Sequence, residues 1–392
     1  MENSPIKAPT MTLTSGPVAI YPRVQEALSR PVPYDYDPYF QNFYEQVCLK
    51  AGQAMQSEKP ALILHAEPAV AIEAAAASLI SANDTVLNLA SGVYGKGFGH
   101  WATRYCKRLT EVEVAYNEAI DPAQVVEALR ANPDVTIVSA VHHDTPSGTI
   151  NPIDEIGAVV KAHGALLLVD AVSSFAGMDV HPGACAADIF ITGPGKCLGG
   201  SPGLSVLDVS DAAWAQMENN QTAPHASVLS LLDWKDAWNK DNAFPFTPSV
   251  SEVQGLDAAL DHYLEEGPEV VWHRHDLTAR ACRAGIKAMG LELWPACESI
   301  AAPSTTAVKI PGGLTTKQIH SAARQTYGVT LSAGRHQTYD KLIRIGHMGP
   351  VAEPIYAIAA VAVFGAAVRQ HGITADVGQG IEAAMAEIPN IA

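Results

Sequence analysis

The chain has 392 residues, of which 48% are hydrophobic and 17% charged, and its formal net charge is −16. This composition excludes a disordered chain, and the acidic balance excludes nucleic acid or an anionic membrane surface as the main partner. A chain of this length is expected to form more than one domain.

From its sequence, we expect the chain to have neither a secretory signal nor a metal framework. The N-terminus MENSPIKAPTM lacks a basic region followed by an apolar run, which argues against a secretory signal. The longest apolar stretch, Pro354 to Val368, is short and rich in alanine, so it predicts a buried helix and not a membrane span. Six cysteines without a CxxC pair predict a reduced, cytoplasmic protein without zinc or another metal.

The first junction that could bind a ligand follows the predicted strand Ala61 to Leu64 and precedes an alanine-rich helix, Ala71 to Leu79. Such a junction presents backbone N–H groups to an anion. Here it carries Glu67, an anion, and Pro68, which has no N–H. A phosphate oxygen ~4 Å from an ionised Glu67 would cost roughly 4 kcal/mol per unit charge at an effective dielectric of about 20. Glu67 therefore either disfavours phosphate or simply complements the helix dipole.

Two further loops follow predicted strands. The strand Thr85 to Leu89 leads into a glycine-rich loop with one aromatic residue, Tyr94, which either stacks on a planar heterocycle or packs on the core. The strand Val135 to Val141 leads into a histidine pair and Thr145, whose hydroxyl either meets a ligand oxygen or stabilises a turn. Adjacent residues on a strand point to opposite faces, so the two histidines are predicted to be structural and not to share a metal.

The strongest pair of candidates is Asp170 and Lys196. Asp170 ends the apolar run that begins at Ala165, and Lys196 lies in a glycine-rich turn after the short strand Ile189 to Ile191. A lysine beside buried strands favours the neutral amine, which forms a Schiff base with an aldehyde, although a surface lysine would fit the same loop. An aspartate that keeps a pyridine nitrogen protonated completes the pair that pyridoxal chemistry requires.

Predicted strands and helices alternate from residue 60 to residue 205, which indicates an α/β fold with a mostly parallel sheet and ligands at the carboxyl ends of the strands. Residues 219–250 are irregular and aromatic, as is typical of a loop that faces a partner. A smaller C-terminal region contains Arg335 on a glycine loop and Arg344 within an apolar strand. A guanidinium there requires a carboxylate, from the protein or from a ligand.

Several segments resemble fold-type I aminotransferases of the alanine/serine–glyoxylate group. VDAVSSFAGM, TGPGKCLGG and KLIRIGHMG are similar to the aspartate, lysine and arginine motifs of that group. NLASGVYGKGFG, HHDTPSGTINPID and FPFTPSVSE extend the resemblance over nearly the whole chain. It implies a fold-type I pyridoxal-phosphate-dependent transferase fold, with a seven-stranded sheet in a large domain and a smaller C-terminal α/β domain. The corresponding boundaries are an N-terminal arm at 1–20, a large vitamer-binding domain at 21–285 and a small domain at 286–392.

The resemblance also assigns roles to the candidate residues. Lys196 would be the Schiff-base lysine, Asp170 would hold the pyridine nitrogen and Tyr94 would stack on the ring. Thr145 would meet the ring hydroxyl, and Arg335 and Arg344 would bind a substrate carboxylate. Some relatives bind the phosphate with a threonine from the neighbouring subunit, and Thr247 lies at that position in this chain. Those relatives have small residues around the phosphate, whereas this chain has Glu67 and Pro68.

The implied reaction converts pyridoxamine and pyruvate to pyridoxal and L-alanine, in vitamin B6 degradation, with the free vitamer as substrate and no tightly bound cofactor. The resemblance also implies a homotetramer, a dimer of dimers. Two alternatives stay open at this point: a pyridoxal-phosphate-dependent alanine/serine–glyoxylate aminotransferase, and a vitamer-binding protein without catalytic activity.

Overall fold

The structure is a computed structural model that describes residues 8–238 and 244–389. Its strands are β1 (Met11–Leu13), β2 (Leu62–Leu64), β3 (Thr85–Ala90), β4 (Arg108–Glu113), β5 (Val135–Val141), β6 (His143–Asp144), β7 (Thr149–Ile150), β8 (Leu166–Asp170), β9 (Ile189–Thr192), β10 (Ser205–Val209), β11 (Thr305–Lys309), β12 (Val329–Ala333) and β13 (Leu342–Gly346).

The α-helices connect and cover these strands. They are α1 (Pro22–Leu28), α2 (Pro38–Ala54), α3 (Pro68–Leu79), α4 (Val93–Ala102), α5 (Pro122–Ala131), α6 (Ile153–His163), α7 (Asp211–Asn219), α8 (Val250–Glu266), α9 (Pro268–Ala288), α10 (Thr316–Tyr327), α11 (Pro354–Arg369) and α12 (Val377–Ala386). A short 3₁₀ turn, η4 (Gly349–Val351), follows β13.

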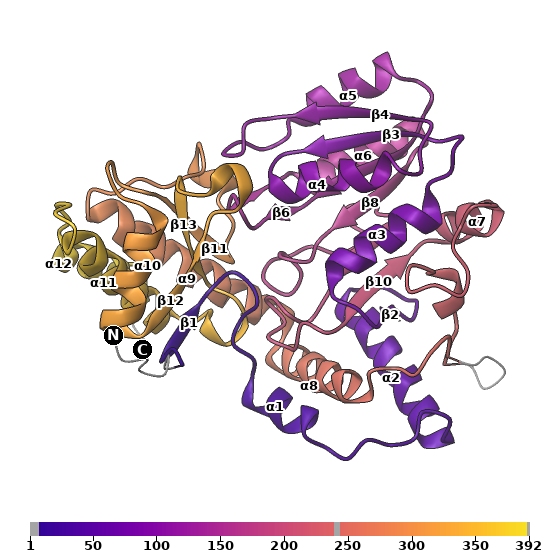
Figure 1. Ribbon diagram of the computed structural model, residues 1–392, viewed down its shortest axis with the longest axis horizontal. Coiled ribbons are helices and arrows are strands. Elements are labelled where there is room, and N and C mark those ends of the chain that lie inside the picture. Colours follow the sequence, from indigo (N-terminus) through magenta and orange to yellow (C-terminus); the bar gives the residue numbers. More distant parts are fainter. Residues whose placement is uncertain (1–7, 239–243, 390–392) are drawn as a thin grey trace, which may run out of the picture.

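The larger sheet has seven strands in the order β2-β10-β9-β8-β5-β3-β4, and β10 runs antiparallel to both of its neighbours while the other strands are parallel. The expected α/β fold with a mostly parallel seven-stranded sheet is therefore confirmed. Because β8 and β9 are parallel neighbours, the residues that follow them emerge at the same edge of the sheet. Figure 1 shows this sheet and its helices on the right, with a smaller α/β body on the left.

The smaller sheet has the order β1-β12-β13-β11, in which β1 is parallel to β12 and the remaining pairs are antiparallel. Its N-terminal strand and its C-terminal strands are therefore far apart in sequence but adjacent in space, as Figure 1 also shows. Residues 11–13 of the expected N-terminal arm are thus part of the smaller sheet.

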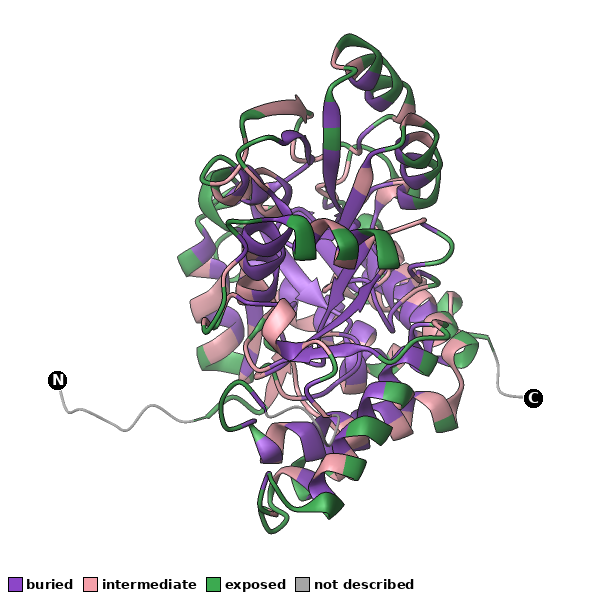
Figure 2. Cartoon of the chain, turned by 90° about the vertical axis from the view of Figure 1, so that its right-hand side faces the viewer, coloured by how far each residue is buried: buried purple, intermediate pink, exposed green. Residues whose placement is uncertain are grey.

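Two hydrophobic cores lie under these sheets. The larger core is built from the apolar strands of the seven-stranded sheet and its helices, and β3, β9 and β10 are buried throughout because helices cover both faces. Figure 2 shows these buried strands at the centre of the chain and exposed positions on the outer helices. The long helix α9 joins both cores, with Val271 in the larger one and Ile286 in the smaller one. The domain boundary after residue 285 remains a prediction.

The helix α11 contains the apolar stretch that the sequence marks as a buried helix, and its residues Ala357, Val361 and Phe364 lie in the smaller core. Within the two described ranges, no helix combines the length and the apolar character needed to cross a membrane.

The segment around Tyr94 differs from the prediction. Much of the glycine-rich segment expected to be a loop after Leu89 is the helix α4, which begins at Val93 and ends at Ala102. The Asp144 carboxylate accepts hydrogen bonds from the backbone N–H groups of Tyr94 (2.7 Å) and Gly95 (3.3 Å), which satisfies the first turn. The glycine content of this segment obscured a helix whose start depends on a side chain 50 residues away.

Candidate active site

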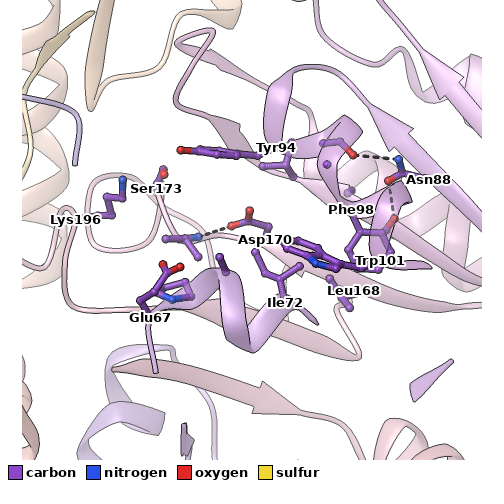
Figure 3. Close-up of a pocket in the computed structure, with 18 of the residues that line it drawn as sticks. Glu67, Ile72, Asn88, Tyr94, Phe98, Trp101, Leu168, Asp170, Ser173 and Lys196 are labelled. Carbon is purple, nitrogen blue, oxygen red and sulfur yellow. Dashed lines mark hydrogen bonds between the residues drawn. The ribbon is translucent and has the colours of Figure 1, made fainter. Parts of the chain in front are cut away.

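Asp170 and Lys196 lie together at the carboxyl edge of the larger sheet. Asp170 is the last residue of β8 and pairs with Ile191 of β9, and Lys196 follows the turn after β9. Both line a cavity of about 210 Å³. In Figure 3, Lys196 and Glu67 lie at one end of this cavity, and the apolar residues Trp101 and Leu168 lie at the other.

Burial shifts both charged groups toward their neutral forms. Burial raises the pKa of Asp170 to about 6, against a lowering by the hydrogen bond from the Val172 backbone N–H (3.0 Å). Burial, followed by the positive charge of Arg344, lowers the pKa of Lys196 to about 8. Near neutral pH the carboxyl group is therefore mostly ionised, and a substantial fraction of the lysine is the nucleophilic amine.

Tyr94 forms a wall of the cavity, and Figure 3 shows its ring across the cavity from Ile72. Its backbone is fixed by Asp144 at the start of α4, and its hydroxyl accepts a hydrogen bond from the Arg335 guanidinium (2.8 Å). An aromatic ring held at both its backbone and its hydroxyl offers a rigid face to a planar ligand.

The junction before α3 forms the end of the cavity nearest to Lys196. Glu67 occupies the N-cap position, is exposed, and makes no capping hydrogen bond with its side chain, and Pro68 is the first helical residue. Both residues line the cavity. The helix start therefore offers one N–H fewer than usual and adds a carboxylate, which suits a neutral or cationic ligand group better than a phosphate.

A second cavity of about 510 Å³ adjoins the first and shares Glu67, Tyr94 and Lys196 with it. It is also lined by Arg335 and Arg344. Arg344 lies in the middle of β13 and is 7% exposed, and among the described residues its one hydrogen bond runs from Nε to the Ala333 carbonyl oxygen (2.8 Å).

The surroundings of Arg344 therefore favour a ligand carboxylate over a protein carboxylate as its partner. Burial, with a contribution from the charge of Arg335, lowers the pKa of Arg344 to about 10, which leaves the guanidinium charged at neutral pH. No described carboxylate forms an ion pair with it, so an anion entering the second cavity would find an uncompensated positive charge.

Two predicted site residues, Thr145 and Thr247, lie outside the two cavities, and so does His143 of the pair that is predicted to be structural. Thr145 is buried, and its hydroxyl has no hydrogen-bond partner among the described residues. Thr247 is exposed on the segment before α8 and lines neither cavity. His143 is buried beneath the site, where Nδ1 lies 2.9 Å from the Ser304 hydroxyl, and burial lowers its pKa to about 3. No cluster of three or more metal-ligating side chains occurs in the described ranges.

The sequence did not reveal several residues that shape the site. Asp144 caps α4, Val172 lines both cavities, and the backbone of Ser15 and Gly16 lies against Lys196. The signals for these residues in the sequence are Asp144 itself, four positions before Gly148, and the Gly-Pro pair at residues 16–17. Neither signal identifies its distant contact, because that contact is made in the folded chain.

Comparison with known proteins places this site in context. Residues 68–352 match the family described as Aminotransferase class-V. The pyridoxamine–pyruvate transaminase of Mesorhizobium japonicum is 60% identical over 380 residues, which cover 97% of each chain. The crystal structure of pyridoxamine–pyruvate aminotransferase from Mesorhizobium loti matches with a TM-score of 0.96, 60% identity and 97% coverage of each chain. Ureidoglycine–glyoxylate aminotransferase from Bacillus subtilis matches with a TM-score of 0.92 and 26% identity, over 98% of this chain and 99% of that one.

These matches correct one expectation. Class-V aminotransferases depend on pyridoxal phosphate and bind it as a cofactor, so the expectation that no cofactor is tightly bound is wrong. The residues at the sheet edge fit the pyridine ring of this group, since Asp170 can hold its nitrogen, Tyr94 can cover its face and Lys196 can reach its aldehyde carbon. The Glu67–Pro68 junction fits the phosphate poorly, for the electrostatic reason given above.

Proposed function

This chain belongs to the class-V aminotransferase family, and from that premise we propose that it transfers the amino group of pyridoxamine to pyruvate, giving pyridoxal and L-alanine. The main observation in favour of pyridoxamine as the amino donor is the Glu67–Pro68 junction at the Lys196 end of the cavity. A carboxylate there favours a vitamer whose side arm is an uncharged hydroxymethyl group over one that carries a phosphate dianion. The 60% identity to a transaminase named for pyridoxamine and pyruvate supports the same donor and acceptor.

The chain's own residues supply the proton movements of this reaction. A protonated pyridine ring withdraws electrons from the carbon that loses a proton. Asp170, as a carboxylate above pH 6, keeps the ring nitrogen protonated. The amine of pyridoxamine condenses with the keto carbon of pyruvate and releases water. Lys196, with its lowered pKa, then accepts a proton from the methylene carbon and returns it to the α-carbon that becomes alanine, and hydrolysis of the new C–N bond to the vitamer releases pyridoxal and L-alanine.

The remaining residues bind and orient the two substrates. Arg344, with Arg335 beside it, binds the carboxylate of pyruvate in the second cavity. Tyr94 covers the ring of the vitamer and ties that wall to Arg335. Thr145 bonds the ring hydroxyl, and its buried, unpartnered hydroxyl supports that role. Thr247 contributes to the site of a neighbouring copy, and its exposure is consistent with that role.

We further propose, on the same resemblance, a cytoplasmic homotetramer that acts in the breakdown of vitamin B6. The shared sites that Thr247 implies require at least two copies of the chain.

A paired turnover assay tests the choice of donor. Pyridoxamine and pyridoxamine phosphate are each supplied with pyruvate, and the aldehyde and alanine are followed. We expect a ratio of kcat/KM that favours pyridoxamine by roughly 100-fold or more, from one anionic repulsion of a few kcal/mol. Glu67→Gln should reduce this preference at least tenfold by improving turnover of the phosphorylated amine.

Glu73→Gln is the matched control, because Glu73 lies on the same helix, pairs with Arg104 and does not line the cavity. That variant should keep the wild-type preference. Efficient turnover of glyoxylate with a bound phosphorylated vitamer, and little turnover of free pyridoxamine, would instead identify an alanine/serine–glyoxylate aminotransferase.

A further inference from the structure

An N-terminal segment crosses the active site on its way between the two cores. Leu13, at the end of β1, lies in the smaller core, and Val24, in α1, lies in the larger one. The residues between them pass the mouth of the site, where Ser15, Gly16 and Pro17 line the second cavity. We refer to residues 14–21 as the crossing segment.

The crossing segment touches Lys196 with its backbone. The Lys196 amine donates a hydrogen bond to the Ser15 carbonyl oxygen (3.0 Å), and Ser15 is 1% exposed. Gly16 has φ +120°, and a Cβ atom at this position would lie 1.9 Å from Lys196 Nζ and 2.8 Å from Cε. Only glycine therefore leaves room for the amine here and adopts this backbone conformation without strain.

The smaller sheet fixes the segment before this contact. Met11 to Leu13 pair in parallel with Val329 to Leu331, and the Ser15 N–H donates to the Ser332 hydroxyl (3.0 Å). A Cβ atom at Gly346 would lie 2.1 Å from the Thr14 carbonyl oxygen, so the close approach to β13 depends on that glycine.

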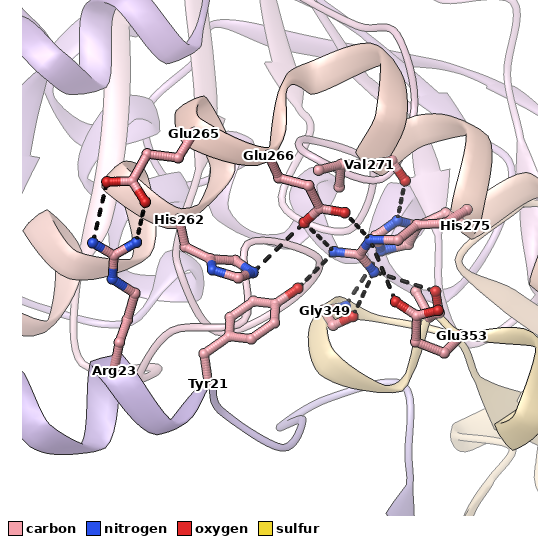
Figure 4. A network of polar contacts seen from close by, with 11 residues as sticks. Tyr21, Arg23, His262, Glu265, Glu266, Val271, His275, Gly349 and Glu353 are labelled. Carbon is pink, nitrogen blue, oxygen red and sulfur yellow. Dashed lines mark hydrogen bonds and ion pairs between the residues drawn. The ribbon is translucent and has the colours of Figure 1, made fainter.

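The loop that carries Lys196 and the helix α9 fix the segment after the contact. The Tyr21 N–H donates to the carbonyl oxygen of Gly199, in the same loop as Lys196 (3.1 Å). Arg274 donates hydrogen bonds to the Tyr21 hydroxyl (2.6 Å), to Glu266 and to the Gly349 carbonyl oxygen (2.9 Å), and Figure 4 shows Tyr21, Glu266 and Gly349 close together. The position of Ser15 is therefore set by contacts on both sides of the site.

We propose that Ser15 and Gly16 are positioning residues for Lys196. The Ser15 carbonyl oxygen holds the amine at the cavity whenever the amine is not bonded to a ligand, and the missing side chain of Gly16 leaves the space in which the amine moves. A carbonyl oxygen accepts from both the amine and the ammonium form, so this contact persists while Lys196 gains and loses a proton. The inference rests on the proposed role of Lys196 and adds to it a backbone partner from the crossing segment.

Attachment of pyridoxal to Lys196 tests the inference without relying on turnover. Pyridoxal is added to the protein, the product is fixed with borohydride, and peptide mass mapping locates it. Gly16→Ala should weaken attachment at Lys196 by roughly 10- to 100-fold, because it displaces the amine by about an ångström. In steady-state assays the same variant should lower kcat more than it raises KM for pyruvate.

Gly164→Ala is the matched control, since Gly164 also has a positive φ (+88°) but has no atom within 4 Å of its Cβ position. It should reproduce the backbone strain and leave attachment at Lys196 unchanged. Equal attachment in Gly16→Ala and wild type would overturn the inference.

Ser332→Ala provides a second test that leaves the segment's glycine intact. Loss of the hydrogen bond to Ser15 should weaken attachment by roughly 2- to 10-fold, and Ser332→Thr, which keeps the hydroxyl, should restore it. If Gly16→Ala does not fold, an unchanged Ser332→Ala variant would overturn the inference by itself. A wild-type protein that takes up no pyridoxal at Lys196 would instead overturn the proposed function.

Discussion

The two halves of the site are held in different ways. Asp170 and Lys196 come from adjacent parallel strands of one buried sheet, so their separation is set within the larger core. Arg344 lies on a strand of the smaller sheet, and Arg335 lies on the loop before that strand. Among the hydrogen bonds that join the halves are those from Arg335 to Tyr94 and from Lys196 to Ser15.

This difference separates two tasks. The residues of the larger sheet have shifted pKa values and surround the cavity that fits a pyridine ring, so they are suited to proton movement. Arg344 of the smaller body stays charged at neutral pH and lines the second cavity together with Arg335, so this side is suited to binding a carboxylate. Substitutions on the two sides should therefore change different kinetic constants.

Arg344→Lys is expected to give the largest difference between the effect on pyruvate binding and the effect on the vitamer. A lysine cannot form the paired hydrogen bonds of a guanidinium with a carboxylate, and its shorter reach leaves the buried site partly unfilled. KM for pyruvate should rise by roughly 10- to 100-fold, from the loss of a charged hydrogen bond. Steady-state kinetics with varied pyruvate measure this change.

Attachment of pyridoxal to Lys196 should remain within about twofold of wild type in the same variant, since that ligand carries no carboxylate. Arg335→Lys serves as a comparison at an exposed position and should raise KM less. A loss of pyridoxal attachment with KM unchanged would mean that Arg344 acts on the vitamer and not on the keto acid.

The pH dependence of vitamer binding tests the half of the site that comes from the larger sheet. The pKa of Asp170 is raised to about 6 by burial, so the carboxylate that we propose holds the ring nitrogen is lost as pH falls through 6. Affinity for pyridoxine, an alcohol that cannot condense with Lys196, should fall about tenfold per pH unit below 6. A carboxyl group with its ordinary pKa would leave the affinity flat to about pH 4.

Asp170→Asn is the control for this titration. It should bind pyridoxine weakly, and the ratio of wild-type to variant affinity removes the titration of the ligand itself. The same variant should be slightly more stable than wild type at pH 7. Because the pKa of the Asp170 carboxyl group is raised in the folded state, the wild-type protein loses stability as pH rises from about 4 to 6, and the variant does not. A rise in Tm of roughly 2 °C is expected from about 1 kcal/mol. A ratio that does not change between pH 5 and 7 would contradict the role of Asp170.

The sequence predicts the larger body better than the smaller one. Apolar strands that alternate with helices define a parallel sheet, and that topology brings the ends of β8 and β9 to one edge, so Asp170 and Lys196 could be paired in advance. The pairing of β1 with β12 joins residues more than 300 positions apart, and no local pattern encodes it. The start of α4 could not be predicted for the same reason, because Asp144 of the distant strand β6 caps it.

The candidate residues of the site divide along similar lines. Those whose chemistry is unusual for their surroundings, such as Arg344 in an apolar strand, could be recognised from sequence. Ser15 and Gly16 could not, because they act through a backbone carbonyl oxygen and through the absence of a side chain. The junction at Glu67 was recognised because it departs from what a helix start offers to phosphate.

The smallest expected effect lies where the two halves touch. Tyr94→Phe keeps the ring that forms the cavity wall and removes the hydroxyl that accepts from Arg335. Because Arg335 is exposed, the lost hydrogen bond should cost little, and KM for pyruvate should rise roughly two- to threefold through a less ordered Arg335. Pyridoxine affinity should not change, since the ring face is preserved. Combining Tyr94→Phe with Arg335→Lys in a double-mutant cycle measures the link directly, and the two KM effects should be less than additive in free energy. Strict additivity would show that the Arg335–Tyr94 contact does not connect the carboxylate-binding side to the wall of the vitamer cavity.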